Sequence, residues 1–595
     1  MANGTLDVIS VEEAGSLPGL FRERVLRTPQ AVAYRHFARM QSRWEDYTWA
    51  ESARQVKAIQ VALEKEGLSP GDRVAIMLRN CPQWVFFEQA ALGMGLVVVP
   101  LYTEDRAENV AYVLQDAGIK LLLIEDVHTL QQLEPIRAQL EGLLRVISLE
   151  ACQSGGGFAR LVTLTDWQVF DEEPASVPDL DIDALATLVY TSGTTGRCKG
   201  VMLSHRNILF NAFAAVELFP IFREDKLLSF LPLSHMLERT LGYYIPMMTG
   251  ASVAFARSVQ DLAEDLLSQQ PTILISVPRI YERVYNKIQT QVASKSPFAQ
   301  SLFTNAVEVG WQRFQKKGGG GLRWPVLKAL VAKKIMAKLG GRLRMAICGG
   351  APLSPDVAKT FIGLGLNLIQ GYGLTETSPI ISGNPENDND PASVGTPLPG
   401  IEVKVGDDDE ILTRSPSVMM GYWNNPAATR EMIDEEGWLH TGDKGVLKNN
   451  HIYITGRLKE IIVLSNGEKV PPVDMEIAIA LDPVVEQVLV LGEGKPFLSA
   501  IVVLDPEVWK FEAEALGVDA EDASVLSSEP VCKWMLARIA TQLKGFPGYA
   551  KLRAVTLTTR PWNIEEGTMT PTMKLRRAVI VEKNQECIAG MYKGH

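Results

Sequence analysis

The feature that most constrains the fold is an alternation of short apolar runs with segments of helical periodicity, which begins at Gly71. Each run has the length of a buried strand, and parallel neighbouring strands need a crossover connection that is usually a helix. The alternation therefore predicts α/β layers with largely parallel sheets. The apolar runs are Arg73–Leu78, Leu96–Tyr102, Lys120–Glu125, Leu185–Tyr190, Leu227–Pro232, Ser252–Phe255, Thr272–Val277, Arg344–Cys348 and Asn367–Gln370.

The two ends of the chain show a different pattern of apolar and polar residues. Residues 1–70 are amphipathic and predict mostly helix. From about residue 400, short strands and turns predict a small β-rich subdomain, and two apolar runs at Glu486–Leu491 and Phe497–Leu504 predict a hairpin. We therefore predict a large N-terminal domain over residues 1–458, in which about 400–458 form the β-rich subdomain. A small α+β domain would follow over 459–595.

Composition excludes several classes of protein. The chain has 595 residues, 46% of them apolar, and a net charge of −11, which argues against a general nucleic-acid binder. Its six cysteines are scattered without a C-x-x-C pair, which argues against a zinc site or disulfides and suits a reducing compartment. No signal peptide is visible, and the uncharged run Thr240–Ala256 predicts a buried helix that turns into a strand. We expect a cytoplasmic protein.

The stretch Tyr190–Gly200 predicts a phosphate-binding loop. Seven of its eleven residues are Gly, Ser or Thr, and it follows the apolar run Leu185–Val189. Small residues let backbone N–H groups approach an anion closely, and Lys199 supplies a point charge for a phosphate. The spacing of a Walker A loop is absent, because Gly200 follows Lys199. The alternative is a mobile surface turn.

Five further segments suit the binding of one nucleotide, although each alone could be a turn, a capped helix or a solvated lysine. Two glycine-containing segments follow strands and permit close approach of a flat ring, and the second of them also offers a carboxylate suited to Mg²⁺. A third places Asp443 in a turn, where it could accept ribose hydroxyls. The segments are Gly349–Ser354, Gln370–Thr377, Gly437–Asp443, Gly456–Lys459 and Thr570–Arg577.

Residues 311–345 form a basic segment in an acidic protein. They contain ten Lys or Arg and no Asp or Glu, with aromatic and aliphatic residues interleaved. The segment predicts contact with anionic lipid or with a polyphosphate ligand. The alternative is a solvated helical pair with a flexible glycine hinge at Gly318–Gly321.

From about residue 20 to 580, the sequence resembles the adenylate-forming superfamily of acyl-CoA synthetases, non-ribosomal adenylation domains and luciferases. Tyr190–Gly200 resembles the phosphate loop of that family, except that Cys198 stands where proline is usual. Within the superfamily the chain is most similar to long-chain fatty acyl-CoA synthetases. The segments that carry this closer similarity are Leu231–Arg239, Pro278-Arg279, Ser354, Phe546–Lys551 and the basic insert at 311–345.

The resemblance implies a role for each matching residue. The phosphate loop would hold the β- and γ-phosphates of ATP through Thr191, Ser192, Gly193, Thr194, Thr195, Gly196 and Lys199. The adenine would lie between Gly349, Gly350 and Ala351 on one side and Gln370, Gly371, Tyr372 and Gly373 on the other. Asp443 would bind the ribose, with Arg457 nearby. Thr375 would contact the α-phosphate, Glu376 and Thr191 would ligate Mg²⁺, and Lys574 and His235 would lie beside the carboxylate of the acyl substrate.

The implied reaction joins a long-chain fatty acid to coenzyme A in two steps, through an acyl-AMP. The small domain would be mobile and would rotate about a hinge at Lys459 between the steps. An acyl-AMP ligase that loads a carrier-protein thiol, a luciferase-like fate of the adenylate, and a non-catalytic acyl or nucleotide binder are the alternatives. We expect peripheral contact with the inner face of an anionic membrane through 311–345. The oligomeric state is not readable from the sequence, and a homodimer is compatible with it.

Overall fold

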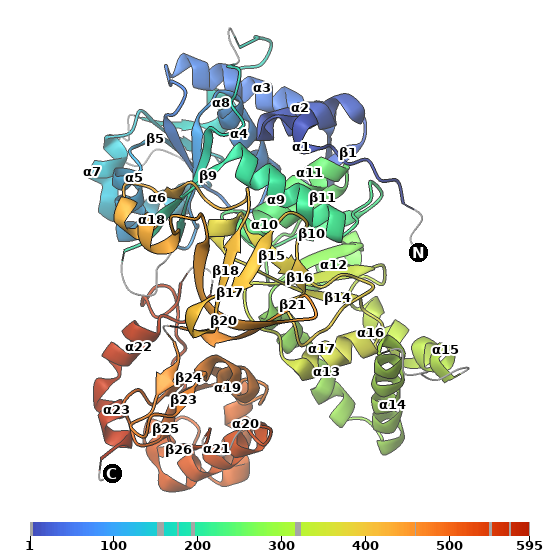
Figure 1. The fold of residues 1–595 in the computed structure, drawn as a ribbon, viewed down its shortest axis with the longest axis vertical. Coiled ribbons are helices and arrows are strands. Elements are labelled where there is room, and N and C mark those ends of the chain that lie inside the picture. Colours follow the sequence, from blue (N-terminus) through green and yellow to red (C-terminus); the bar gives the residue numbers. More distant parts are fainter. Residues whose placement is uncertain are drawn as a thin grey trace.

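The computed structural model describes residues 4–150, 160–174, 178–191, 197–315, 323–458, 460–546, 550–570 and 573–593. Two large sheets form the body of the molecule, as the alternation of apolar runs predicts (Figure 1). The first has eight strands in the order β19-β9-β8-β4-β3-β5-β6-β7. Its strands are β3 (Arg73–Met77), β4 (Val97–Pro100), β5 (Ile119–Ile124), β6 (Arg145–Ser148), β7 (Leu161–Thr163), β8 (Leu185–Thr191), β9 (Lys199–Ser204) and β19 (Gly421–Tyr422).

The second sheet has nine strands in the order β16-β15-β14-β13-β12-β10-β11-β1-β2. Parallel pairing runs from β14 to β1, and antiparallel strands close both edges. The strands are β1 (Val32–Ala38), β2 (Arg43–Thr48), β10 (Lys226–Ser229), β11 (Ser252–Phe255), β12 (Ile273–Ser276), β13 (Met345–Cys348), β14 (Leu368–Gly373), β15 (Ile380–Gly383) and β16 (Thr396–Pro397).

Helices lie between the two sheets and on their outer faces. The central helix α4 (Pro82–Gly93) is buried at almost every position, and Glu88 within it forms a fully buried ion pair with Arg239. Alternate residues of one strand pack into different clusters: Ile273 and Ile275 of β12 face the central helices, whereas Leu274 faces the outer ones. The remaining N-terminal helices include α1 (Val11–Ala14), α2 (Leu17–Arg27), α3 (Trp49–Lys65), α5 (Ala107–Asp116), α6 (Val127–Gln132), α7 (Arg137–Glu141), α8 (Leu164–Trp167), α9 (His205–Leu218), α12 (Leu262–Gln269) and α17 (Pro355–Gly363).

The prediction of mostly helix over residues 1–70 is wrong for Val32–Thr48, which form the β1–β2 hairpin at the edge of the nine-stranded sheet. This edge is held by long-range pairing of β1 with β11, a contact that local periodicity does not reveal. By contrast, the uncharged run Thr240–Ala256 behaves as predicted. It forms the π-helical turn η2 (Arg239–Tyr244), α11 (Ile245–Thr249) and then β11.

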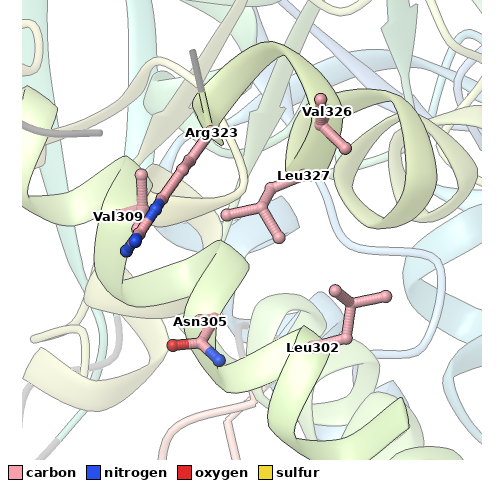
Figure 2. A pocket seen from close by; sticks show the side chains of 6 residues that line it. All are labelled: Leu302, Asn305, Val309, Arg323, Val326 and Leu327. Carbon is pink, nitrogen blue, oxygen red and sulfur yellow. The ribbon is translucent and has the colours of Figure 1, made fainter. Parts of the chain in front are cut away.

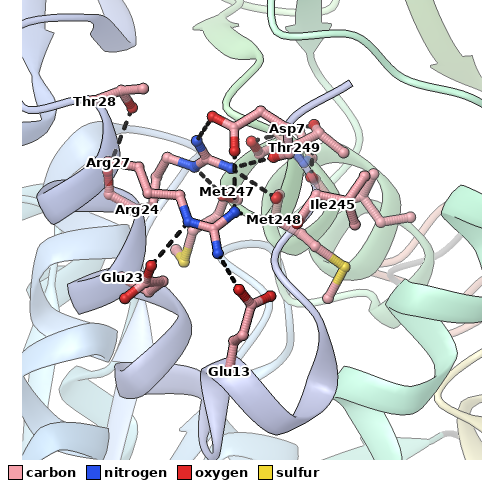
Figure 3. Close-up of polar contacts among 12 residues, drawn as sticks. Asp7, Glu13, Glu23, Arg24, Arg27, Thr28, Ile245, Met247, Met248 and Thr249 are labelled. Atoms are coloured by element: carbon pink, nitrogen blue, oxygen red, sulfur yellow. Dashed lines mark hydrogen bonds and ion pairs between the residues drawn. The ribbon is translucent and has the colours of Figure 1, made fainter. Parts of the chain in front are cut away.

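A buried arginine ties the N-terminal segment to α11 (Figure 3). The Arg24 guanidinium donates to the carbonyl oxygens of Met247 and Met248 at 2.9 and 2.8 Å, and to the Asp7 carboxylate at 2.7 Å. The carbonyl groups at a helix C-terminus lack partners within the helix, so a cation there is favourable. Arg24 therefore stabilises the C-terminal end of α11 where the chain turns into β11.

A four-stranded antiparallel sheet follows, made of β17 (Glu402–Val405), β18 (Glu410–Arg414), β20 (Leu439–Lys448) and β21 (His451–Arg457). The C-terminal part has its own hydrophobic cluster and a three-stranded sheet of β24 (Val485–Leu491), β25 (Leu498–Leu504) and β26 (Leu552–Thr558). The predicted hairpin is β24–β25. The other elements are α18 (Pro426–Met432), β22 (Ile462–Val463), β23 (Lys469–Val470), α19 (Pro472–Ile479), α20 (Pro506–Leu516), α21 (Glu529–Gln542), α22 (Arg577–Lys583) and α23 (Gln585–Met591).

These elements form the large layered α/β body, β-rich part and small α+β part that the sequence predicts. In Figure 1 the C-terminal part lies below the β-rich sheet. Within the described residues, no helix combines the length and the apolar character that a membrane span requires. The boundary at residue 458 stays a prediction, and the predicted hinge, Lys459, lies outside the described residues.

Candidate active site

The predicted phosphate loop connects two antiparallel strands. Thr191 at the end of β8 lies opposite Lys199 at the start of β9, so these two residues close the base of the loop. Ser192, Gly193, Thr194, Thr195 and Gly196 lie outside the described residues. Burial raises the pKa of Cys198, beside this base, to about 11. Its thiol is therefore protonated near neutral pH and is a poor nucleophile.

A tyrosine that the sequence did not single out connects this loop to Glu376. The Tyr422 hydroxyl donates to Glu376 Oε1 at 2.8 Å, and Lys199 Nζ lies 4.8 Å from the centre of the Tyr422 ring. Tyr422 reaches this place because β19 pairs with β9, across more than two hundred residues of sequence. Burial and the Glu376 carboxylate raise the pKa of Tyr422, so it acts as a hydrogen-bond donor. No local pattern could have revealed this contact.

Glu376 and Thr375 lie in a 3₁₀ turn, η4 (Thr375–Thr377), which follows β14. The described residues contain no group of three His, Cys, Asp or Glu side chains that could hold a metal ion alone. Mg²⁺ is commonly bound by one or two carboxylates, by substrate phosphates and by water. A half-buried Glu376 close to a phosphate loop fits that pattern, with the Thr191 hydroxyl as a further oxygen ligand.

The two glycine segments come together at the carboxyl ends of the neighbouring parallel strands β13 and β14. A Cβ atom at Gly349 would lie 3.7 Å from the carbonyl oxygen of Gly371. The Gln370 amide fixes this arrangement: its oxygen accepts from Leu353 N at 3.3 Å, and its nitrogen donates to the Pro391 carbonyl at 2.6 Å. Gln370 therefore positions the loop that contains Gly350 and Ala351. In open α/β sheets, ligands bind at this end of the strands.

One detail of the prediction is corrected here, because Gln370–Gly373 belong to β14 and do not follow it. The strand is longer than the apolar run because antiparallel pairing with β15 holds Gly371, Tyr372 and Gly373 in extended form.

Asp443 lies in the middle of strand β20, and the prediction of a turn is wrong. Burial alternates along the start of this strand, with Leu439, Thr441 and Asp443 inside. The Tyr372 hydroxyl donates to Asp443 Oδ2 at 2.7 Å, and Arg457 Nε donates to Oδ1 at 2.9 Å. The carboxylate is only 3% exposed and is fixed at both oxygens. Burial and this carboxylate raise the pKa of Tyr372, which keeps its hydroxyl protonated.

His235 lies at the N-cap of the short helix α10 (Met236–Glu238), next to the first glycine segment. Its Nδ1 accepts from Leu237 N at 3.2 Å, and the Leu237 side chain lies against Gly349. Burial and the positive charge of Lys574 lower the pKa of His235 to about 4. The imidazole is therefore neutral near pH 7, with its proton on Nε2, which is a free donor for a substrate oxygen.

Lys574 lies in a tight turn of the C-terminal part, closed by the bridge between Met569 and Leu575. Its backbone N–H donates to Thr570 Oγ1 at 3.0 Å. The side chain reaches solvent, yet it lies among charges from both parts of the chain. Partial removal of water from the ammonium, together with the Arg457 charge, lowers the pKa of Lys574. The carboxylates of Asp443, Glu460 and Glu376 oppose that effect.

Around the ends of β8 and β14 and the middle of β20, the structure thus brings together Lys199, Glu376, Tyr372, Asp443, Arg457, His235 and Lys574. An ion pair between Arg279, at the start of α13, and Glu486 of β24 joins the two parts of the chain beside this site. The sequence marks Arg279 only as part of a segment typical of the family and does not indicate this contact. The fold and the site together define a two-part α/β protein with a candidate nucleotide site in its large part, facing a lysine of its C-terminal part.

Comparison with known proteins agrees with this class. The profile of the AMP-binding enzyme family matches residues 21–423, and that of the AMP-binding enzyme C-terminal domain matches residues 459–595. The chain is 32% identical to the long-chain-fatty-acid–CoA ligase FadD15 of Mycobacterium bovis, over 98% of both chains. It is 33% identical to the peroxisomal long chain acyl-CoA synthetase 6 of Arabidopsis thaliana, over 93% of this chain and 82% of the other. The chain belongs to the AMP-binding enzyme family.

Solved structures share the fold at lower identity. The adenylation domain of a carboxylate reductase from Mycobacterium chelonae superposes with a TM-score of 0.79 at 21% identity, over 97% of this chain and 91% of the other. MatB from Rhodopseudomonas palustris with ATP bound superposes with a TM-score of 0.69 at 22% identity, over 96% of this chain and 99% of the other.

Proposed function

We propose that this protein is an ATP-dependent long-chain fatty acid:CoA ligase. A fatty acid and ATP give acyl-AMP and pyrophosphate, and acyl-AMP and coenzyme A then give acyl-CoA and AMP. The similarity to FadD15 over nearly the whole of both chains supports the substrate class. The observation that carries the proposal is the position of Lys574, whose charge acts on His235 and is influenced by Asp443, Arg457 and Glu376.

In the first step, a carboxylate oxygen of the fatty acid attacks the α-phosphorus, and the bond from that phosphorus to the bridging oxygen of pyrophosphate breaks. Both reactants are anions, so positive groups must offset their repulsion. Lys574 is placed to bridge the carboxylate and the α-phosphate, and Lys199 to hold the leaving pyrophosphate. Catalysis of this kind rests mainly on positioning and on electrostatic stabilisation.

The nucleotide is held by groups that are already fixed before it binds. Asp443, oriented by Tyr372 and Arg457, accepts the two ribose hydroxyls. Gly349, Gly350 and Gly371 leave room for the adenine ring. Bound Mg²⁺ would neutralise phosphate charge, held by Glu376 and Thr191. Neutral His235 donates from Nε2 to the acyl carboxylate without adding a charge that would compete with Lys574.

In the second step, the coenzyme A thiol attacks the acyl carbonyl, a new carbon–sulfur bond forms, and AMP leaves. Lys574 has no role in this step. We propose that rotation of the C-terminal part about Lys459 withdraws Lys574 and brings residues 461–467 to the site. The ion pair of Arg279 with Glu486 stabilises the arrangement in which Lys574 faces the nucleotide.

The proposal extends to location. We propose peripheral contact with an anionic membrane through the basic segment 311–345, since a long-chain fatty acid is itself a membrane-partitioning substrate. The proposal does not depend on the oligomeric state, and light scattering would show whether the protein is a monomer or a homodimer.

A pyrophosphate-release assay with palmitate, with and without coenzyme A, tests the proposed reaction. We expect a burst of about one pyrophosphate per protein without coenzyme A, because acyl-AMP stays bound, and continuous turnover with it. Turnover that requires a carrier-protein thiol and ignores coenzyme A would make the protein an acyl-AMP ligase of the carrier-loading type. ATP binding without any pyrophosphate release would make it a non-catalytic binder.

A further inference from the structure

Three helical segments form an arm that projects from the body, at the lower right of Figure 1. They are α13 (Pro278–Ala293), α14 (Pro297–Phe314), the run of α15 (Arg323–Leu327), η3 (Lys328–Ala332) and α16 (Lys333–Ala337). The arm is firmly attached, because α14 crosses α17 at two glycines. A Cβ atom at Gly310 would lie 1.8 Å from the carbonyl oxygen of Gly363. The arm therefore moves with the body and with the nucleotide loop that precedes α17.

The arm has an unbalanced positive charge. No acidic residue occurs between Glu308 and Asp356, and Glu308 is already paired with Lys359 at 2.9 Å. Lys328, Lys333 and Lys334 are exposed, and none of the ion pairs among the described residues includes them. In a protein whose net charge is −11, these cations form a local positive face that its own carboxylates do not neutralise.

Beside these cations lies an open hollow of about 410 Å³ between α14 and α15 (Figure 2). Figure 2 shows Leu302 and Val326 at one end and Arg323, Val309 and Asn305 at the other, with Leu327 between them. One end of the hollow is thus apolar, and the other end carries the positive charge of Arg323.

The apolar end continues onto the surface. Phe298 lies one helical turn before Leu302 and is 77% exposed. On the facing helix, Val326 is 56% exposed and Leu330, one turn further, is 48% exposed. Large apolar side chains that are exposed together on two neighbouring helices mark a contact surface.

We infer that this surface, made of Phe298, Leu302, Val326, Leu330 and the flanking Lys328, Lys333 and Lys334, docks on a bilayer that contains anionic phospholipid. The lysines contact the headgroups, and the apolar side chains enter the boundary between headgroups and acyl chains. The inference rests on the proposed function only in that the docked enzyme would take its fatty acid from the membrane. The positive charge of the surface favours an anionic ligand. An anionic bilayer also accounts for the exposed Phe298 and Val326, which have no role in binding a free polyphosphate.

The test is co-sedimentation of the full chain with vesicles of phosphatidylcholine, with and without phosphatidylglycerol as about one third of the lipid. We expect binding only to the anionic vesicles. The variant Lys328→Glu/Lys333→Glu/Lys334→Glu should lower the partition coefficient by at least about a hundredfold, since each lysine near an anionic surface contributes about fivefold. The control Lys120→Glu/Lys448→Glu/Lys510→Glu changes the net charge equally at exposed sites outside the arm, and should bind like the parent.

A second variant tests the apolar half. Phe298→Ser/Val326→Ser keeps every charge, and we expect it to bind anionic vesicles more weakly than the parent. This difference from the parent should remain when salt is raised from about 0.1 to about 0.5 M, because salt screens charges and not apolar contacts. Equal binding to neutral vesicles, undiminished binding of the triple lysine variant, or no binding by the parent would each overturn the inference. If free coenzyme A displaces the parent from vesicles and the serine variant binds normally, the face is a polyphosphate site and the inference fails. Ligase activity on octanoate in vesicle-free buffer should be the same in all variants. This measurement distinguishes a failure of membrane docking from a failure of the proposed reaction.

Discussion

Asp443 is held in one orientation, as the proposed ribose site requires. Its two oxygens already accept from Tyr372 and Arg457, so the side chain cannot turn away before the nucleotide arrives. Its burial means that each hydrogen bond to a ribose hydroxyl is made with little competition from water.

We expect Asp443→Asn to weaken ATP binding by about 10- to 100-fold, because hydrogen bonds to a charged group contribute about 1.5–3 kcal/mol. The substitution also removes the nearer counter-charge of Arg457 and leaves it, among the described residues, only Glu460, at 4.0 Å. Isothermal titration with ATP measures the effect. Asp409→Asn, at an exposed position that precedes β18 of the same sheet, is the matched control and should leave the titration unchanged. A normal ATP affinity in Asp443→Asn would remove this residue from the site.

Lys574 should separate the two half-reactions. Lys574→Ala should slow pyrophosphate release from ATP and palmitate by about 10²- to 10³-fold, as expected for loss of a group that stabilises developing charge. Thioester formation from supplied palmitoyl-AMP should change less than about twofold, well below the effect of losing a transition-state contact. Lys544→Ala, an exposed lysine of the same part of the chain, is the control. An equal loss in both half-reactions would contradict the assigned role.

The lowered pKa of Lys574 gives this role a pH signature. A lysine works here only while it is charged, and a pKa below its usual 10.5 means that the charge is lost at lower pH than for a free lysine. The rate of the first half-reaction should therefore fall on the alkaline side, with a midpoint below 10.5. The variant Lys574→Arg should keep partial activity, and its rate should no longer fall within the alkaline pH range that can be measured, because arginine stays charged there.

At the scale of elements, the crossing of α14 and α17 is the tightest contact of the arm. Gly310→Ala would place a Cβ atom 1.8 Å from a backbone oxygen, so the helices must separate. We expect a loss of about 1–3 kcal/mol in the free energy of unfolding, measured with urea. The control is Gly590→Ala in α23, where a Cβ meets nothing within 4 Å. There the better helix propensity of alanine should stabilise the helix by about 0.5–1 kcal/mol. Equal effects at both positions would contradict the close packing.

The sequence predicts well those elements whose signal is local. The parallel strands appear as continuous apolar runs because both of their faces are covered, and the β24–β25 hairpin follows from the two neighbouring apolar runs Glu486–Leu491 and Phe497–Leu504. The β1–β2 hairpin depends on a partner far away in the sequence, β11, and the extension of β20 through Asp443 depends on its register with β21, in which Asp443 lies opposite Arg457. Local periodicity carries no information about such partners. Tyr422 was missed for the same reason, since its contact with Glu376 requires β19 to pair with β9.

The residues themselves indicated a phosphate loop and further segments suited to one nucleotide. The role of each residue came only from the family resemblance, because glycines, a lysine and an acid in turns are common in any chain. The structure adds the positions of these residues relative to one another and the hydrogen bonds that hold them. It shows that Gln370 positions a loop, that Asp443 is fixed from two sides, and that His235 is neutral.

At the scale of the whole molecule, the proposed function depends on the orientation of the C-terminal part, and a charged contact joins that part to the body. Arg279 donates to the Glu486 carboxylate across the two parts of the chain, and both side chains remain about one third exposed. An ion pair of this exposure contributes about 0.2–1 kcal/mol. That is enough to bias an equilibrium between two orientations without locking either one.

Reversing the charge of one residue of this ion pair should therefore change the rate of the first half-reaction relative to that of the second. We expect Glu486→Arg to lower the rate of pyrophosphate release by about two- to fivefold, since repulsion from Arg279 disfavours the orientation in which Lys574 faces the nucleotide. Thioester formation from supplied palmitoyl-AMP should stay equal or rise. The double variant Arg279→Glu/Glu486→Arg restores an attractive pair and should recover most of the loss. If the double variant is no better than Glu486→Arg alone, the ion pair does not control the orientation, and the effect of the single substitution belongs to local packing around β24.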